Sequence, residues 1–324
     1  MLTRRSACAG LISSTALLAS SPSWAQAYPS RPIRLVLPYA AGGGTDAIAR
    51  VVAQSMSEKL GSVIVENIVG AGGNNATTQV AAAPPDGLTV LMANQGPMVV
   101  NPHLFKNMKV DPLTAFDPVT LIAAAPLVVI VSPKSPHKTL KDLIDEAKKS
   151  PGKLNYGSAG NGSASHLATI LLAQTAGIDI VHVPYRGAAP AITDVMGGNT
   201  QFMITTVPSV VGLIQGNEMR PLAVTPKKRA AILKDVPTIA ESGYPDYEAS
   251  AWYGFVVPKG TPTAIVDTLR KATVEAINAP LVKERLDNEG AEPIGNTGEE
   301  FAAYMKAESA KWAKVTRDAK ITLD

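Results

Sequence analysis

The chain has 324 residues, of which 46% are hydrophobic and 18% are charged, and its formal net charge is +3. This composition excludes an intrinsically disordered protein, and the length predicts two domains. Two of the 30 basic residues lie within 1–27, so 28 basic side chains face 27 acidic ones in the rest of the chain. That balance provides no basic surface for nucleic acid, which we do not expect as a partner.

The first 27 residues have the pattern of an export signal. Arg4 and Arg5 give a positive start, a mostly small and apolar stretch covers 6–20, and Ala25-Gln26-Ala27 matches the motif that signal peptidase cleaves. The apolar stretch is shorter than the ~20 residues that span a bilayer. The sequence therefore predicts cleavage after Ala27 and a periplasmic protein, with the choice between general and twin-arginine export open. Cleavage removes Cys8, the only cysteine, and so excludes disulfides and thiol catalysis.

Short apolar strands alternate with amphipathic helices along the chain. Strands are expected at 33–37, 62–66, 88–93, 154–157, 178–183, 201–205 and 221–225. Helices are expected before Gly61, after a capping box at 139–142, after the loop at 158–165, and over 262–278 and 299–317. This β-then-α order predicts an α/β protein in which parallel sheets are covered by helices.

Two apolar strands lie on either side of the middle third, at 127–131 and 252–257. If both strands cross between lobes, the first lobe consists of 28–127 plus 251–324, and the second consists of 128–250. The expected architecture is then two lobes joined by two crossover strands, with a cleft between the lobes.

Few residues are arranged for catalysis or metal binding. The histidines lack the spacing of metal ligands, and we expect neither a metal nor a cofactor; they are His103, His137, His166 and His182. Tyr156-Gly157-Ser158-Ala159-Gly160 approaches the G-x-S-x-G elbow of serine hydrolases, but tyrosine replaces its first glycine. Gly160-Asn161-Gly162 starts a dinucleotide fingerprint in which Ser165 replaces the third glycine. We expect no enzyme; a secreted hydrolase using Ser158 is the minor alternative.

Two glycine-rich junctions each connect a strand to a helix. They are Gly42-Gly43-Gly44-Thr45-Asp46 in the first expected lobe and 158–163 in the second. The first N–H groups of a helix lack partners and carry partial positive charge, and glycines let a ligand approach the backbone. Thr45, Ser158 and Ser163 add hydroxyls. Facing each other over a cleft, the two junctions would bind a carboxylate, although tight packing alone also explains such turns.

Other candidate residues have two interpretations each. Asp46 either complements the dipole of its own helix or contacts a ligand amine. His166 is either a core residue or a ligand contact. Arg186 follows an expected strand where a cleft loop belongs, or it lies on the solvated surface. Trp252 and Tyr253 either pack the hinge or touch the ligand.

The order of these motifs is similar to a known family. The similarity starts at Tyr28-Pro29 and includes Gly42–Asp46, Gly70-Ala71-Gly72-Gly73-Asn74, Pro85-Asp86-Gly87, Tyr156–Gly160, Val183–Gly187 and Trp252-Tyr253-Gly254. In this order the chain resembles the Bug-type extracytoplasmic solute receptors of tripartite tricarboxylate transporters. Tyr39-Ala40-Ala41 departs from the pattern of many members, and the segment around Thr205 varies widely, so the identity of the ligand stays open.

The resemblance implies a type II periplasmic-binding-protein fold: two lobes of mixed sheet covered by helices. It implies a monomer that binds a small organic acid, acidic amino acid or aromatic acid and delivers it to membrane permease subunits. A receptor that reports ligand to a signalling partner is the alternative. The ligand-binding residues that we expect are Tyr39, Ala41, Gly42, Gly43, Thr45, Asp46, Asn94, Ser158, Ala159, Gly160, Ser163, His166, Tyr185, Arg186, Gly187 and Thr205.

Overall fold

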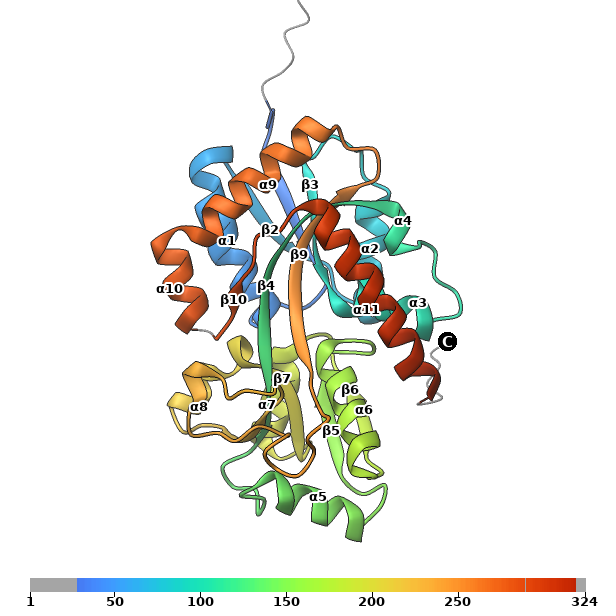
Figure 1. The fold of residues 1–324 in the computed structure, drawn as a ribbon, viewed down its shortest axis with the longest axis vertical. Helices are drawn as coiled ribbons and strands as arrows, with labels where there is room; N and C mark the ends of the chain where they lie inside the picture. Colours follow the sequence, from blue (N-terminus) through green and yellow to red (C-terminus); the bar gives the residue numbers. More distant parts are fainter. Residues whose placement is uncertain (1–27, 289, 319–324) are drawn as a thin grey trace, which may run out of the picture.

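The computed structural model describes residues 28–288 and 290–318. The export signal predicted for 1–27, with its cleavage after Ala27, lies outside these residues. Figure 1 shows two α/β lobes, one above the other, with two long strands running from one lobe into the other. The predicted α/β class is therefore confirmed.

The sheet of the first lobe has a parallel core. β1 (Ile33–Leu37) lies between β2 (Val63–Asn67) and β3 (Thr89–Asn94), and pairs in parallel with both. β9 (Ser250–Pro258) continues the sheet antiparallel to β3, followed by β4 (Phe116–Val131) antiparallel to β9. The short β10 (Glu292–Pro293) pairs with β4. The parallel pairing expected from the sequence is thus found for β1, β2 and β3, whereas β4, β9 and β10 pair antiparallel.

Helices of the first lobe cover this sheet (Figure 1). The longer ones are α1 (Gly44–Leu60), α2 (Asn74–Ala81), α9 (Thr263–Asn278), α10 (Pro280–Asn288) and α11 (Gly298–Asp318). Shorter turns of helix are η1 (Ala71–Gly73), η2 (Gly96–Val100), α3 (Asn101–Leu104) and α4 (Pro112–Ala115). The sequence analysis did not predict η2, α3, α4 or α10.

The second lobe repeats the scheme with another parallel core. β5 (Asn155–Ser158) pairs in parallel with β6 (Val181–Pro184) and β7 (Phe202–Thr206). Both β7 and β8 (Arg220–Val224) pair antiparallel to the end of β4. The helices of this lobe are α5 (Leu140–Lys149), α6 (Ala164–Ala176), α7 (Ala188–Gly197), η3 (Val207–Ser209), α8 (Val211–Gln215) and η4 (Ala231–Leu233).

β4 connects the two sheets. Its 16 residues pair with β9 from Phe116 to Pro126, and with β7 and β8 from Leu127 onward. The strands expected at 127–131 and 252–257 are therefore parts of β4 and β9. The lobe limits themselves, 28–127 plus 251–324 and 128–250, stay a proposal.

Local sequence determines the start of α5. The Thr139 hydroxyl accepts from the Asp142 N–H at 3.1 Å, and the Asp142 carboxylate accepts from the Thr139 N–H at 2.9 Å. These two bonds form the predicted capping box, and they satisfy N–H groups that the helix itself leaves free. Leu140, Leu143 and Ile144 then lie on the buried face of the helix.

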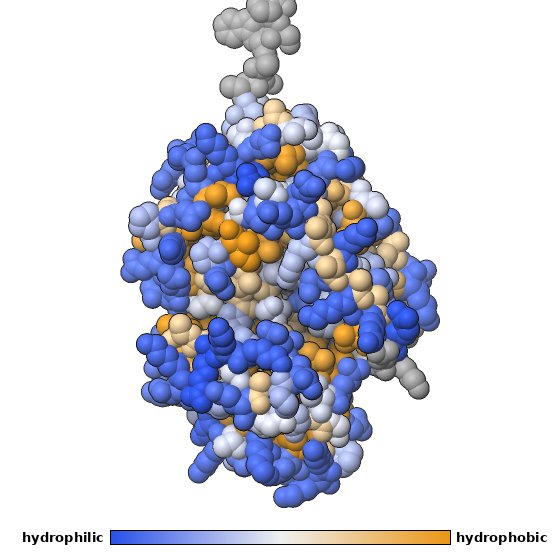
Figure 2. All heavy atoms as spheres, viewed as in Figure 1, coloured by the Kyte–Doolittle hydropathy of each residue, from blue (hydrophilic) through white to orange (hydrophobic). Residues whose placement is uncertain are grey.

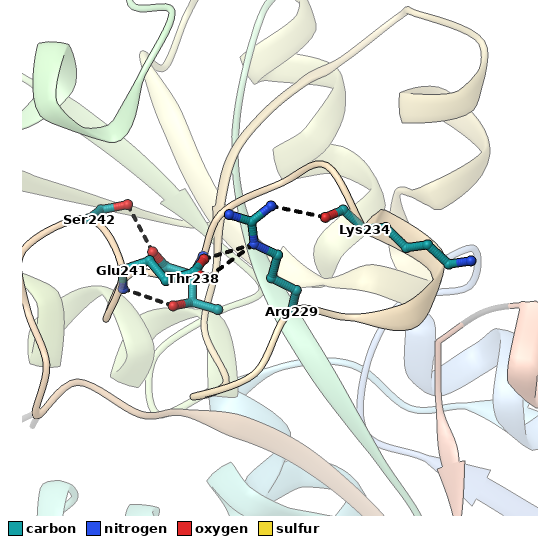
Figure 3. A network of polar contacts seen from close by, with 5 residues as sticks. All are labelled: Arg229, Lys234, Thr238, Glu241 and Ser242. Atoms are coloured by element: carbon teal, nitrogen blue, oxygen red, sulfur yellow. Dashed lines mark hydrogen bonds and ion pairs between the residues drawn. The ribbon is translucent and has the colours of Figure 1, made fainter.

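Side-chain polar contacts hold the segment between β8 and β9 (Figure 3), together with a parallel β-bridge between Val224 of β8 and Thr238. The Arg229 Nε donates to both oxygens of Glu241, at 2.9 and 3.2 Å, and its Nη1 donates to the Lys234 carbonyl at 3.2 Å. The Glu241 carboxylate also accepts from the Thr238 N–H at 2.7 Å. The network fixes a long connection across the outside of the second lobe.

Figure 2 shows hydrophilic residues over most of the visible face of both lobes, with small separate apolar areas between them. Within 28–288 and 290–318, no helix combines the length and the apolar character needed to cross a membrane.

Candidate functional site

Strand ends from both lobes meet around one cavity. β1 and β3 end on this side of the first lobe, and β5 and β7 end here in the second, which is where ligands bind in α/β proteins. The volume of this cavity is about 50 Å³. The cavity is lined by Tyr39, Ala40, Gly43, Gly44, Thr45, Asn94, Gln95, Gly96, Ala159, Ser163, Ala164, Ser165, Ala188, Thr205, Thr206, Ser209, Ala251, Trp252 and Tyr253. Among these described residues there is no Asp, Glu, Lys, Arg or His.

The first-lobe wall of the cavity is the start of α1. Gly43 precedes the helix in an extended conformation and provides no side-chain cap. The Gly44 N–H donates to the Ser209 hydroxyl of the second lobe at 2.7 Å. A Cβ atom on Gly44 would lie 2.4 Å from Thr206 Oγ1, so glycine is required for this approach of the lobes.

The second-lobe wall includes the start of α6, whose loop is closed by its own hydrogen bonds. Ser163 caps the helix by accepting from the His166 N–H at 3.4 Å, and its hydroxyl donates to the Gly160 carbonyl at 2.6 Å. The Ala159 N–H donates to the Ser165 hydroxyl at 2.8 Å. The Gly162 N–H donates to His166 Nδ1 at 3.1 Å. Ala159, Ser163 and Ser165 nevertheless line the cavity.

A stack of aromatic rings lies next to the α6 loop in the interior of the second lobe. The His166 and His182 ring centres are 4.0 Å apart, and the Tyr156 ring centre lies 4.9 Å from that of His182. Burial, with His182 as a second cause, lowers the pKa of His166 to about 3, and burial lowers the pKa of His182 to about 4. Both rings are therefore neutral near pH 7, and His166 is held in the core of the second lobe.

Ser158 makes a hydrogen bond to His182, as a hydrolase nucleophile would. The distance from Ser158 Oγ to His182 Nε2 is 2.6 Å. However, Ser158 is 0% exposed and does not line the cavity.

Asp46 is bound by its own lobe. One carboxylate oxygen accepts from the Gly42 N–H at 3.1 Å and from Arg50 Nε at 2.9 Å, while the other accepts from Asn67 Nδ2 at 3.2 Å. Burial alone raises the pKa of Asp46, but the bonds from Arg50, Gly42 and Asn67 hold this pKa below its usual value. Asp46 thus stabilises the junction before α1 as an ionised group.

A second cavity adjoins the first and shares Tyr39 and Ala159 with it. Its lining includes Gly160, Tyr185 and Arg186. The Arg186 side chain is exposed, and its backbone carbonyl accepts from the Ala40 N–H of the other lobe at 3.0 Å. The Tyr185–Gly187 loop therefore contacts the first lobe, while Arg186 lies outside the main cavity.

The structure divides the sequence-predicted ligand contacts into two groups. On the cavity lie Tyr39, Gly43, Thr45, Asn94, Ala159, Ser163 and Thr205. Not among its lining residues are Ala41, Gly42, Asp46, Ser158, Gly160, His166, Tyr185, Arg186 and Gly187. Ligand contact by any of these residues stays a prediction.

The sequence analysis did not select several residues that line the cavity. Trp252 and Tyr253 were considered for either the hinge or the ligand, and they belong to the crossover strand β9 as well as to the cavity. Thr206 and Ser209 stand at the end of β7 and in η3, and Gln95 follows β3. Their position after strands that end at the cleft was the only sequence signal for them. Within the described ranges, no group of three or more His, Cys, Asp and Glu side chains is placed to hold a metal ion.

Comparison with solved structures identifies the architecture. The periplasmic binding protein BugD superposes with a TM-score of 0.88 at 38% identity, over 91% of this chain and 99% of BugD. The R. palustris protein Rpa4515, solved with adipate, gives a TM-score of 0.88 at 37% identity over 91% and 99% of the two chains. MatC from Rhodopseudomonas palustris, with bound malate, gives 0.85 at 30% identity over 89% and 99%. The expected type II periplasmic-binding-protein fold is thereby confirmed.

Sequence comparison leads to the same group of proteins. Protein BugT of Bordetella pertussis is 34% identical over 319 residues, which cover 98% of each chain. The family model of the tripartite tricarboxylate transporter family receptor matches residues 48–321. This chain therefore belongs to the Bug-type receptor family of tripartite tricarboxylate transporters.

Proposed function

We propose that this protein is a periplasmic receptor that binds a small carboxylate between its lobes and delivers it to a tripartite tricarboxylate permease. The observation that carries the proposal is that the starts of α1 and α6, from opposite lobes, line one cavity, and that none of the described residues lining it is charged. An anion bound there would be held by backbone N–H groups, hydroxyls and helix dipoles. The adipate and malate in two similar structures support an acid as the ligand.

The helix dipoles alone do not provide enough binding energy. Each helix start contributes ~0.3–1 kcal/mol, whereas micromolar affinity needs about 8 kcal/mol. Hydrogen bonds in the cavity and the contacts between the lobes must supply the rest. The Gly44–Ser209 and Ala40–Arg186 bonds are two such contacts, and they form only when the lobes are together.

A thermal-shift screen tests the binding function. The exported protein, purified from the periplasm, is heated with dicarboxylates, tricarboxylates, amino acids, aromatic acids and amides. A ligand at 100 times its Kd stabilises the folded protein by about 2.7 kcal/mol, which corresponds to a Tm increase of about 5 °C. If no acid or amide raises Tm, the protein is not a receptor for these ligands.

Delivery and export have separate tests. N-terminal sequencing of the mature protein should begin at Tyr28. Uptake of the labelled ligand by cells that carry the permease should require this receptor. Uptake that is equal with and without the receptor would contradict the transport role while leaving ligand binding intact.

A further inference from the structure

Three residues that line the cavity each have a buried polar atom with no hydrogen-bond partner among the described residues. These atoms are the Tyr39 hydroxyl, Asn94 Oδ1 and Trp252 Nε1. Asn94 is 5% exposed and Trp252 is 1% exposed. Leaving a buried polar group unpaired is unfavourable, so folded proteins rarely retain one without a ligand or water to pair with it. The unpaired groups that line the cavity are therefore available to a ligand.

Several other polar groups around the cavity already have partners in the chain. Ser163 and Ser165 bond to the α6 loop, and Ser209 accepts from the Gly44 N–H. Asn94 Nδ2 donates to the Thr45 hydroxyl at 3.4 Å. This bond occupies the amide nitrogen of Asn94 and leaves the amide oxygen without a partner. Because an amide oxygen only accepts hydrogen bonds, Asn94 needs a ligand group that donates.

The charge of the lining restricts what that donor can be. None of the described residues that line the cavity carries a carboxylate, and Asp46 at the start of α1 is already bound by Gly42, Arg50 and Asn67. Burial of an ammonium group without a counter-charge from the protein is unfavourable. A hydroxyl group donates to Asn94 Oδ1 without this cost. The Tyr39 hydroxyl can donate, so it suits a carboxylate oxygen.

We infer, on the basis of the function proposed above, that the ligand is a short hydroxy acid and that Asn94 selects it by accepting from its hydroxyl. Asn94 stands at the carboxyl end of β3, next to the α1 start that would bind the carboxylate. Removal of the hydroxyl from the ligand leaves Asn94 Oδ1 unpaired. Replacement by ammonium places a positive charge in the cavity that no carboxylate of the described lining residues can pair with.

Isothermal titration calorimetry with matched acids tests this inference. The three sets are propionate, lactate and alanine; succinate, malate and aspartate; and glutarate, 2-hydroxyglutarate and glutamate. Within a set that binds, the hydroxy acid should bind about 3- to 10-fold more tightly than the other two, which is the effect of one neutral hydrogen bond. Equal or tighter binding of the unsubstituted acid or the amino acid would overturn the inference.

Two variants identify Asn94 as the selecting residue. Asn94→Leu removes the amide at similar size and should weaken binding of the hydroxy acid more than binding of the unsubstituted acid, so that the two acids bind with equal affinity. Asn94→Asp keeps the shape but adds the missing negative charge, and should reverse the preference in favour of the amino acid. Loss of affinity by the same factor for all members of a set would show that Asn94 is only structural.

The outcomes separate this inference from the proposed function. Binding of carboxylates without a hydroxyl preference contradicts the inference alone. If neither these acids nor longer and aromatic ones bind, the receptor function fails, and the hydroxyl preference fails with it.

Discussion

The starts of α1 and α6 face the same cavity but are built differently. The α6 start is capped by Ser163, and its loop gives backbone N–H groups to Ser165 and His166 of the same loop and helix. The α1 start has Gly43 in the capping position, without a side-chain cap, and its first N–H bonds to Ser209 of the other lobe. The α6 start is thus complete within its own lobe, whereas the α1 start depends on what lies across the cleft.

This difference assigns separate tasks to the two lobes. A loop that satisfies its own hydrogen bonds keeps its shape with or without ligand, and so provides a fixed wall. A helix start without a cap keeps N–H groups available for a ligand and for the opposite lobe. We therefore expect changes at α6 to affect mainly the stability of the protein, and changes at α1 to affect mainly ligand binding.

The first expected effect concerns pH and the α6 side. His166 Nδ1 accepts from the Gly162 N–H and must be unprotonated to do so. Its folded pKa of about 3 lies well below the usual value of 6.5, so below pH 6.5 the unfolded state binds more protons. Stability is complete above that pH and falls as the pH decreases toward 3. Between about pH 6.5 and about pH 5, the low pKa of His166 should reduce the free energy of unfolding by up to about 2 kcal/mol. The low pKa of His182 reduces it in the same direction.

Urea unfolding of the protein and of His166→Phe measures this loss. Phenylalanine keeps a ring in the stack but has no titrating nitrogen, so the variant should be less stable at neutral pH and lose less stability on acidification. An equal loss in both proteins would assign the pH dependence to other groups.

The next effect is on the α1 side. In Gly44→Ala, the new Cβ would lie 2.4 Å from Thr206 Oγ1 and 3.0 Å from the Ser209 hydroxyl, which keeps the lobes apart. We expect ligand affinity to fall about 100-fold, or about 2.7 kcal/mol, while the ligand-free protein keeps most of its stability. Titration calorimetry measures the first quantity and urea unfolding the second.

Gly212→Ala in α8 is the matched control for this substitution. No atom outside its own helix lies within 4 Å of a Cβ at that position, so ligand affinity should remain unchanged. If Gly44→Ala binds ligand as tightly as Gly212→Ala does, the α1 start does not require contact with the second lobe.

Local rules predicted the parts of the fold that depend on neighbouring residues. The capping box of α5 needs only Thr139 and Asp142, three positions apart, and the sequence shows both. The long β4 was harder to predict, because its two halves belong to different sheets and Pro126 lies where they join. In such a strand the pairing partners decide the length, and they are distant in sequence.

The site was predictable to a similar degree. Gly43, Thr45 and Ser163 were selected because they follow strands and begin helices, and all three line the cavity. Two glycines in these junctions nevertheless serve different needs. Gly44 avoids a clash with Thr206, whereas Gly160 has a φ of +123° that other residues rarely adopt. Nothing in a single sequence separates these two reasons for a glycine.

The smallest effect tests the comparison most directly, by giving α1 the cap that α6 has. Gly43 is extended, with φ −92° and ψ 174°, a conformation in which serine caps a helix. In Gly43→Ser, the hydroxyl should accept from the N–H groups that the ligand would otherwise use. Gly43→Ala places the same Cβ at 3.4 Å from the Ala188 Cβ without adding a hydroxyl.

Relative to Gly43→Ala, Gly43→Ser should therefore be about 1 kcal/mol more stable without ligand and bind the ligand about 5-fold more weakly. Urea unfolding and calorimetry on the two variants measure both differences. A more stable Gly43→Ser that binds as tightly as Gly43→Ala would mean that the ligand does not use the first N–H groups of α1. The two helix starts would then have the same role in ligand binding, despite their different caps.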